Sequence, residues 1–191
     1  AIIPVHMNGR SANMPAVREI ANKYSIRVIE DAAQALGSRN QDGFLGTQSD
    51  MGCFSLSMAK IISTGQGGFV VTRDKSTYEK LIALRTHGVG NVIDAEWEEP
   101  GFNFRYTDVL ASIGIVQLKE LDENIQKVKA IYSRYEDGVQ DLPYLKLVPV
   151  DIESGEVPVY VEILCKKREQ LIRFLEDRGM QSRAFYPDLN F

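Results

Sequence analysis

The first 31 residues follow a strand–helix–strand pattern that few folds accommodate. AIIPVH is an apolar run typical of a buried strand, and IRVIE at residues 26–30 is a second one. Between them, MPAVREIANKY carries apolar residues at helical spacing. A helix that connects two neighbouring strands in this way makes them parallel, with a right-handed crossover. We therefore expect an α/β fold with a mostly parallel sheet and flanking helices.

The chain continues with the same kinds of element up to about residue 120. MGCFSLS and GGFVVTR read as two more strands, and DKSTYEKLIALRTHG reads as a helix. Asp74 or Ser76 is the expected N-cap of that helix, and Gly88 is its expected end. A long helical region then starts near Thr107 and runs to about residue 139, with a bend near Leu121.

The last third of the chain has a different pattern. YLKLVPV, VPVYVEILC and MQSRAFYP read as strands, and KREQLIRFLEDRG reads as a short helix. We assign residues 1–120 to part of a large α/β domain, and residues 121–191 to a linking helix and part of a small α+β domain. The first residues are apolar and the last is aromatic, whereas chain ends are usually polar, so we expect a piece of a longer protein.

Composition excludes several classes of function. A net charge of -4, with Lys and Arg spread along the chain, argues against nucleic acid or an anionic membrane as partner. No apolar run reaches the roughly 20 residues of a spanning helix. Cys53 and Cys165 lie in apolar runs and favour free thiols in a reducing compartment, so a cytoplasmic location is expected. No spacing of His, Cys or carboxylates suggests a metal site.

A carboxylate follows one of the expected parallel strands. Glu30 and Asp31, in IRVIEDAAQ, stand at the carboxyl end of that strand, and open α/β sheets bind their ligands at this edge. The alternative is that Asp31 only caps the turn that follows.

A lysine and several hydroxyls surround the next strand end. In CFSLSMAK, alternation places Cys53, Ser55 and Ser57 on one face, where small hydroxylic side chains suit a phosphate or simply face water. Lys60 precedes the glycines of STGQGG, whereas the lysine of a Walker A loop follows them. Lys60 is therefore either a surface lysine near a hairpin or an amine held against a ligand.

Together these residues are the set that a pyridoxal phosphate site needs. The lysine amine forms a Schiff base with the cofactor aldehyde. A carboxylate keeps the pyridinium nitrogen protonated, so that the ring accepts electrons. Hydroxyls and backbone N–H groups hold the phosphate.

Seven motifs then occur in an order that is specific to one family. They are PVHMNG, VIEDAAQALGS, SLSMAK, TGQGGFVVT, LRTHG, GFNFRYTD and FYPDLN. Over nearly the whole chain this order resembles the sugar aminotransferases named after DegT, DnrJ, EryC1 and StrS. The resemblance implies the fold type I architecture and pyridoxal 5'-phosphate as cofactor.

The resemblance also assigns roles to single residues. Lys60 matches the Schiff-base lysine that moves the proton between cofactor and substrate. Asp31 matches the carboxylate on the pyridinium nitrogen, and Ser55 matches the phosphate-binding serine. A proline or threonine often precedes the family's lysine, whereas this chain has Ala59, which is a minor departure.

Three further positions complete the expected site. Ala33 would lie against one face of the cofactor ring, and Gln34 would bond its phenolic oxygen. Asn103, in GFNFR, matches a residue that reaches the phosphate bound by the neighbouring subunit. The resemblance therefore implies a homodimer with shared active sites.

The implied activity is transfer of an amino group from glutamate or glutamine to a keto group of a nucleotide-linked deoxysugar, for surface polysaccharide or related amino-sugar biosynthesis. Alternatives are amination of a cyclitol ketone, a related sugar modification, or a non-catalytic fragment or paralogue acting through its dimer face. The family's 3-dehydratase branch carries histidine in place of the lysine, so Lys60 argues against that branch.

Overall fold

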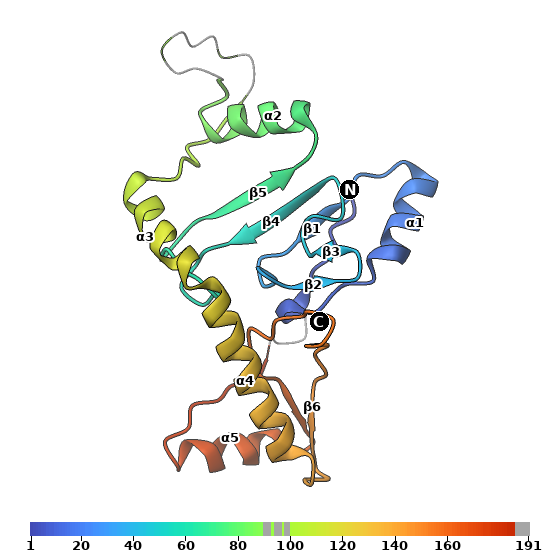
Figure 1. The fold of residues 1–191 in the computed structure, drawn as a ribbon, viewed down its shortest axis with the longest axis vertical. Coiled ribbons are helices and arrows are strands. Elements are labelled where there is room, and N and C mark those ends of the chain that lie inside the picture. The colour runs from blue at the N-terminus through green and yellow to red at the C-terminus, as the bar shows by residue number, and fades with distance from the viewer. Residues whose placement is uncertain (90–92, 94–96, 98–99, 186–191) are drawn as a thin grey trace.

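The computed structural model describes residues 1–89, 93, 97 and 100–185. One sheet with its helices occupies the upper half of Figure 1, and a smaller pair of strands with a helix occupies the lower half. The long helix α4 (Leu121–Val139) runs from one half to the other. The predicted division of the chain at residue 120 stays a prediction.

The main sheet has three strands in the order β1 (Ile29–Asp31), β4 (Met51–Ser55) and β5 (Gly68–Thr72). β1 and β4 are parallel, and β4 and β5 are antiparallel. The start of the chain lies beside β1 through two isolated parallel bridges, Ile2 with Val28 and Val5 with Asp31. The predicted parallel crossover is therefore confirmed.

The prediction of a buried strand at residues 1–6 is only partly right. This segment is extended, but it makes isolated bridges rather than a continuous ladder. Ile3 and Val5 are 61% and 42% exposed, while Pro4 and His6 are buried. Alternate residues of an extended segment point to opposite sides, so only one set is covered here.

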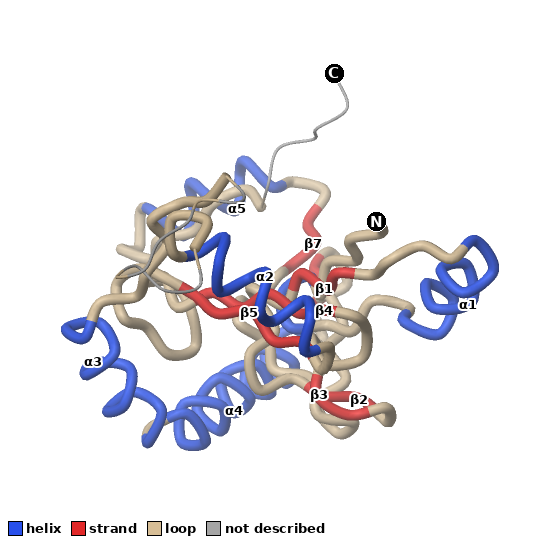
Figure 2. Tube along the Cα trace, turned by 90° about the horizontal axis from the view of Figure 1, so that it is seen from above, coloured by secondary structure: helices blue, strands red, loops and turns tan. Residues whose placement is uncertain are grey.

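Helix α1 (Met14–Tyr24) has the bounds that its sequence pattern predicts. The side chain of Asn13 accepts a hydrogen bond from the backbone N–H of Ala16 and so caps the first turn. Met14 and Ala21 pack with Val28 just before β1. In Figure 2 this helix lies on one side of the sheet, and α3 and α4 lie on the other.

Helix α2 (Lys75–Arg85) begins after Asp74, whose side chain accepts from the N–H of Thr77. Of the two caps predicted, Asp74 is therefore the right one. The long helical region divides into α3 (Asp108–Lys119) and α4, with Glu120 between them, so the predicted bend is confirmed. Thr107 caps α3.

The remaining elements are short. They are η1 (Met7–Gly9), β2 (Arg39–Asn40), β3 (Gly43–Phe44), β6 (Leu145–Leu147), β7 (Ile163–Cys165) and α5 (Arg168–Glu176). β6 and β7 are antiparallel, with α4 beside β6 and α5 beside β7.

Two strand predictions in the last third are corrected. Of the strand expected at residues 157–165, only β7 forms, because backbone groups before it bond to the first part of the chain, as Tyr160 N–H does to Asn8. The strand expected at residues 180–187 is absent over Met180–Phe185, and residues 186 and 187 lie outside the described part.

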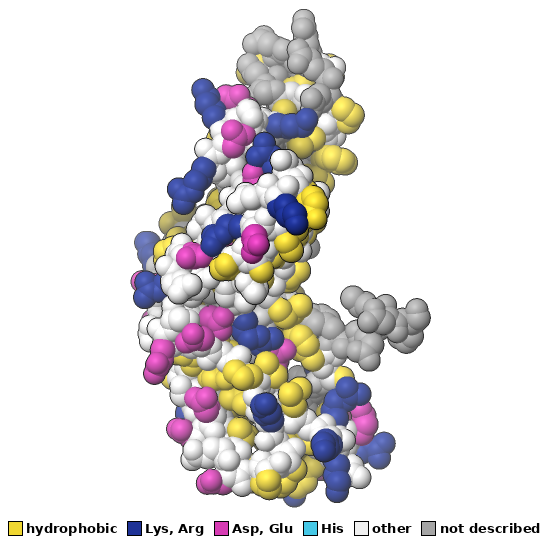
Figure 3. Space-filling view, turned by 90° about the vertical axis from the view of Figure 1, so that its right-hand side faces the viewer, with side chains coloured by type: hydrophobic (Ala, Val, Ile, Leu, Met, Phe, Trp, Pro, Cys, Tyr) yellow, Lys and Arg dark blue, Asp and Glu magenta, His cyan; other side chains and the backbone are white. Residues whose placement is uncertain are grey.

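The surface charges and the helices can be compared with what the composition predicts, namely dispersed Lys and Arg and no spanning helix. Acidic and basic side chains are interspersed over the face drawn in Figure 3. Of the helices in the described part of the chain, none combines the length and apolar character that crossing a bilayer requires. Cys53 and Cys165 are both free thiols.

Candidate active site

Two adjacent carboxylates of β1 point to opposite faces of the sheet. Glu30 lies beside Gly52 of β4, and Asp31 lies beside Cys53. Because side chains alternate along a strand, Asp31, Cys53 and Ser55 share one face, and Glu30 lies on the other. Since β1 and β4 are parallel, Asp31 and Ser55 meet at the same carboxyl edge of the sheet.

The Glu30 face is closed. Glu30 and His6 are both fully buried, with 2.9 Å between His6 Nε2 and Glu30 Oε2. His6 Nδ1 accepts the backbone N–H of Ala12, so Nε2 carries the proton and donates to the carboxylate. The other donors to Glu30 are the N–H groups of Gly46 and Gln48 and the hydroxyl of Ser49.

These donors decide the ionisation of Glu30. Burial alone would raise its pKa, but the hydrogen bonds from His6, Ser49, Gly46 and Gln48 outweigh burial, and the pKa is lowered. Both carboxylate oxygens are occupied, so Glu30 is a structural residue of the core.

Asp31 accepts fewer hydrogen bonds from the protein than Glu30 does. Its Oδ1 accepts the backbone N–H of Ala33 at 3.0 Å, and the side chain is half-buried. No hydrogen bond to Oδ2 occurs within the described residues. Burial and the nearby Asp31 charge together raise the pKa of the Cys53 thiol. Asp31 thus holds the local turn through Oδ1 alone, so a role as a turn cap leaves Oδ2 available and does not exclude a ligand there.

Ser55 ends β4 and begins a small group of hydroxyls. Its Oγ accepts the N–H of Ser57 at 3.3 Å and lies 3.2 Å from the Ser57 hydroxyl. Phe54, on the opposite face, is buried at 8% exposure and stacks on Phe69. The predicted alternation of faces is confirmed for Cys53, Phe54 and Ser55, but β4 ends at Ser55, and Met58, expected on the apolar face, is 83% exposed.

Lys60 lies in a loop that is fixed at its base. Leu56 N–H donates to the carbonyl of Gly67 at 2.9 Å, and Thr64 N–H donates to the carbonyl of Leu56 at 3.0 Å. Lys60 N–H donates to the carbonyl of Ser57 at 3.1 Å. The lysine side chain is half-buried, and whether its amine is held against a ligand stays a prediction.

One glycine of this loop is required by a close contact. Gly67 has φ 103°, and a Cβ there would collide with the ring of Tyr106. The Tyr106 hydroxyl in turn bonds the hydroxyl of Thr64 at 2.5 Å. The glycine turn therefore packs against the segment that precedes α3.

The other three predicted residues occupy two places. Ala33 and Gln34 follow β1 directly, and both are half-buried. Asn103 is exposed, forms an isolated bridge with Thr86 and accepts from Arg105 Nε at 3.0 Å. Within the described residues, no bond joins Asn103 to the other five. An outward-facing position is what a residue needs if it serves a neighbouring subunit.

Two residues that lie near the site, Asn8 and Tyr160, are not identified from the sequence. Asn8 N–H donates to Gln34 Oε1 at 2.8 Å, and the Tyr160 hydroxyl lies 3.3 Å from the carbonyl of Ala59, next to Lys60. Asn8 belongs to the PVHMNG motif, but no spacing pattern relates it to a residue 152 positions away.

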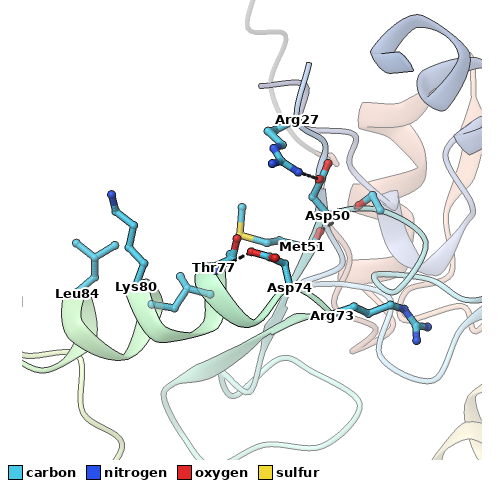
Figure 4. Close-up of a pocket in the computed structure, with 10 residues that line it drawn as sticks. Arg27, Asp50, Met51, Arg73, Asp74, Thr77, Lys80 and Leu84 are labelled. Atoms are coloured by element: carbon cyan, nitrogen blue, oxygen red, sulfur yellow. Dashed lines mark hydrogen bonds and ion pairs between the residues drawn. The ribbon is translucent and has the colours of Figure 1, made fainter. Parts of the chain in front are cut away.

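A separate cavity of about 450 Å³ lies at the opposite edge of the sheet (Figure 4). It is next to the residues that precede β1 and β4. Arg27 there is paired with Asp50, and Asp74 is bonded to Ser76 and Thr77, which lowers the pKa of Asp74 to about 2. Arg27 and Asp50 form an ion pair with each other, and Asp74 caps helix α2. We therefore do not take this cavity as the candidate site.

The residues at the carboxyl edge fit pyridoxal phosphate by the chemistry of their donors and acceptors. Asp31 keeps a carboxylate oxygen for a protonated ring nitrogen, and Ser55 and Ser57 offer hydroxyls to a phosphate. Lys60 supplies an amine within the same loop. The side chain of Ala33 is a single methyl group, which is small enough to lie against a flat ring.

Comparison with known proteins gives one family. Residues 1–190 match the family model described as the DegT/DnrJ/EryC1/StrS aminotransferase family. The chain is 35% identical to the GDP-perosamine synthase of Escherichia coli O157:H7 over 195 aligned residues, which are 98% of this chain and 52% of that protein. The chain thus spans about half the length of this relative.

Solved structures give the same result. DesV of S. venezuelae, crystallised in complex with a ketimine intermediate, has a TM-score of 0.90 at 30% identity, over 97% of this chain and 50% of that one. The E. coli GDP-4-keto-6-deoxy-D-mannose-3-dehydratase, with bound hydrated PLP, has a TM-score of 0.82 at 27% identity, over 95% of this chain and 52% of that one.

The predicted α/β aminotransferase fold and the predicted family are both confirmed by these matches. The cofactor of this family is pyridoxal 5'-phosphate. The chain belongs to the DegT/DnrJ/EryC1/StrS aminotransferase family.

Proposed function

We propose that the protein containing this chain transfers an amino group to a keto group of a nucleotide-linked deoxysugar, with pyridoxal phosphate bound at the carboxyl edge of the sheet. The observation that carries the proposal is the placement of Asp31 and Ser55 on one face of neighbouring parallel strands, with Lys60 in the loop that follows. Family membership supports the reaction class, and the relative named GDP-perosamine synthase supports a nucleotide-linked sugar.

The bound cofactor would supply an aldehyde that takes up the amino group and a ring that stores the electron pair released at carbon. Asp31 would hold a proton on the ring nitrogen through its free oxygen. Ser55 would donate its hydroxyl to the phosphate, and Gln34 would donate its amide N–H to the phenolic oxygen. Ala33 would contact one face of the ring.

Lys60 has two tasks in this proposal. Its amine would hold the cofactor covalently through the aldehyde carbon in the resting protein. When free, the same amine would carry a proton at Nζ between the carbon atoms of substrate and cofactor. Glutamate or glutamine would donate the amino group, and the sugar ketone would receive it by the same steps in reverse.

The proposed assembly is a homodimer in which Asn103 completes the partner's phosphate site. The exposed Asn103 lies between Phe102 and Phe104, whose exposed rings stack with centroids 4.9 Å apart. The neighbouring α3 exposes Val109 and Ile115 at 70% and 64%. Apolar surface of this kind is expected where a second subunit packs.

Subunit complementation tests the shared site. Lys60→Ala and Asn103→Ala are each expected to be impaired as homodimers. In a mixed dimer, one of the two sites receives Lys60 from one chain and Asn103 from the other, and is therefore intact. Recovery of up to about half the wild-type activity per mixed dimer supports a shared site, since one site in two is restored. No recovery in a confirmed mixed dimer contradicts it.

The activity itself is tested with a panel of nucleotide-linked ketosugars and cyclitol ketones, with glutamate labelled with ¹⁵N at its amino group. A product that carries the ¹⁵N label on the sugar, detected by mass spectrometry, is the expected result. Labelled cyclitol would move the assignment to the alternative substrate class. A sugar that loses water without gaining nitrogen would indicate a dehydratase, and a protein that binds no cofactor would indicate a non-catalytic role.

We further propose that the reaction takes place in the cytoplasm and supplies amino sugars for surface polysaccharides or related products. The two free cysteines are compatible with a reducing compartment. Fractionation of cells that express a tagged full-length protein tests this location.

A further inference from the structure

Asn8 connects the first part of the chain to the segment before β7. The residue is fully buried and adopts a left-handed conformation, with φ 54° and ψ 36°. Its Nδ2 donates to the Tyr160 carbonyl at 2.8 Å and to Glu162 Oε2 at 2.7 Å. Its Oδ1 accepts the N–H of Tyr160 at 2.6 Å. Both ends of the side-chain amide are therefore committed.

Neighbouring contacts strengthen the same connection. Arg10 forms an ion pair with Glu162, whose side chain is 11% exposed. A Cβ on Gly9 would collide with the carbonyl oxygen of Val157, so the two backbones touch directly at this point. The clasp, defined here as Asn8, Arg10, Tyr160 and Glu162, therefore holds two distant segments in one fixed arrangement.

The clasp contacts one residue of the candidate site, Gln34, and the residue next to another, Lys60. The Tyr160 hydroxyl donates to the carbonyl of Ala59, immediately before Lys60. The backbone N–H of Asn8 donates to Gln34 Oε1 at 2.8 Å. One of these contacts is to Gln34, which follows β1, and the other is to Ala59, which follows β4. The clasp thus contacts both of the loops that carry proposed cofactor-binding residues.

The contact with Gln34 decides which end of its amide faces the cofactor. An N–H group can bond only the oxygen end, because the NH₂ end offers hydrogens and no acceptor. Gln34 Nε2 is therefore turned away from Asn8, and within the described residues it donates no hydrogen bond. A phenolic oxygen on the cofactor needs a donor, and Nε2 is the donor that this orientation presents.

We propose that Asn8, held by Tyr160 and Glu162, is a positioning residue that fixes the Gln34 amide with its NH₂ toward the phenolic oxygen of the cofactor. The segment before β7 thereby acts on the ionisation of a cofactor bound at the other end of the clasp. This inference rests on the proposed function, because it requires pyridoxal phosphate in the site.

The sign of the effect follows from the charge on the oxygen. A donor favours the deprotonated phenolic oxygen, so the bound chromophore titrates at a lower pH when Gln34 is correctly oriented. Without the clasp the amide can rotate and place its own oxygen against the negative charge. The titration midpoint is then expected to rise by about one pH unit, the size of a weakened hydrogen bond to a charged group.

The test is a pH titration of the visible absorbance of the cofactor-loaded, full-length protein. Asn8→Gly removes the clasp side chain and retains a residue that tolerates positive φ. Glu162→Leu breaks the clasp from the other side, and Glu162→Gln retains an acceptor for Asn8 Nδ2. Glu169→Gln is the matched control, because Glu169 is exposed and is paired with Arg168.

The expected result is a raised midpoint in Asn8→Gly and Glu162→Leu, a midpoint close to wild type in Glu162→Gln, and no shift in the control. In a Gln34→Ala background the midpoint is already raised, and adding Asn8→Gly should shift it no further, since the effect passes through Gln34. A general loss of stability would not produce this dependence. Thermal unfolding of each variant identifies any that fails to fold. If Asn8→Gly or Glu162→Leu fails to fold, the titration midpoint of the other one tests the proposal.

The outcomes separate this inference from the proposed function. Wild-type protein that binds the cofactor and titrates, with unshifted clasp variants, would overturn the role of Asn8 and leave the proposed function intact. A shift from Asn8→Gly that persists in the Gln34→Ala background would overturn the route through Gln34. Wild-type protein that binds no pyridoxal phosphate would overturn the proposed function and this inference together.

Discussion

The two faces of the sheet at the carboxyl end of β1 differ in how their polar groups are used. On one face, Glu30 is fully buried, and both of its oxygens are bonded by protein donors. On the other face, Asp31 is half-buried and bonds one neighbouring N–H through Oδ1. The two carboxylates are adjacent in sequence, yet one completes the core and the other is available to a ligand.

The difference shows that a carboxylate at a strand end is not by itself a site. The number of protein donors around it separates a structural acid from a functional one, because a saturated carboxylate has no lone pairs left for a substrate or cofactor. The face of Asp31 also carries Ser55, and Lys60 follows it in the chain, whereas the face of Glu30 is filled by Ala32, Leu45 and Phe54. The following predictions test this contrast.

Loss of the lysine should give the largest effect. Lys60→Ala removes both the covalent attachment and the proton carrier, so amino transfer should fall by at least about a thousandfold. Single-turnover kinetics with a nucleotide ketosugar measures the loss. Lys129→Ala is the control, because Lys129 bonds the carbonyl of Ile152 near β6 and should leave the rate unchanged. Equal losses in the two variants would contradict the assignment.

Asp31→Asn should lower the rate by about 100-fold while the protein stays folded, because it removes the charge that keeps the ring nitrogen protonated. The variant retains an oxygen for the Ala33 N–H, so its thermal midpoint should stay close to wild type. A rate close to wild type would show that Asp31 only caps the turn. Asp31 would then be a structural carboxylate, as Glu30 is.

Glu30→Gln should instead lower the free energy of unfolding by about 2–4 kcal/mol, because the buried carboxylate loses its charge and the two donors on one of its oxygens lose their acceptor. Denaturant unfolding measures this loss. Glu123→Gln is the control, because Glu123 is exposed and pairs with Lys127 across one helical turn. An unchanged stability in Glu30→Gln would show that the buried network is not needed for folding.

The same pair of proteins should respond to pH in a predictable direction. The pKa of Glu30 in the folded state lies below its ordinary value of 4.5. The contribution of ionised Glu30 to the free energy of unfolding is therefore fully present above about pH 4.5. It is lost as the pH falls through the lowered pKa. The stability difference between wild type and Glu30→Gln should narrow in this acidic range, and a widening difference would contradict the lowered pKa.

Ser55→Ala should give the smallest effect, a weakening of cofactor binding by about tenfold, which corresponds to one lost hydrogen bond to a charged phosphate. Fluorescence titration with pyridoxal phosphate measures the affinity. Ser154→Ala serves as control, because Ser154 belongs to a turn around Asp151. A similar affinity in both variants would place the phosphate elsewhere.

Much of the fold could be predicted because its signals are local. The bounds of α1 follow from apolar spacing and from the Asn13 cap, and the alternate faces of β4 follow from the pleat. The order of Asp31, Ser55 and Lys60 could likewise be read from strand ends and a glycine turn.

The remaining features depend on contacts between distant residues. Nothing in the sequence marks Glu30 as the partner of His6, which lies 24 residues earlier, or Asn8 as the partner of Tyr160. For the same reason residues 157–162 resemble a strand in composition, but their backbone groups bond to the first part of the chain instead. Long-range polar contacts have no sequence period, and so periodicity could not reveal them.

Chemical trapping of the cofactor on the full-length protein identifies the residue that binds it. Borohydride reduction of the pyridoxal-phosphate-loaded protein, followed by proteolysis and mass spectrometry, identifies the lysine that bonds the aldehyde. We expect a single modified peptide, with the added mass on Lys60, and no such peptide from Lys60→Ala. Stable modification of a different lysine, or none in protein saturated with pyridoxal phosphate, would contradict it.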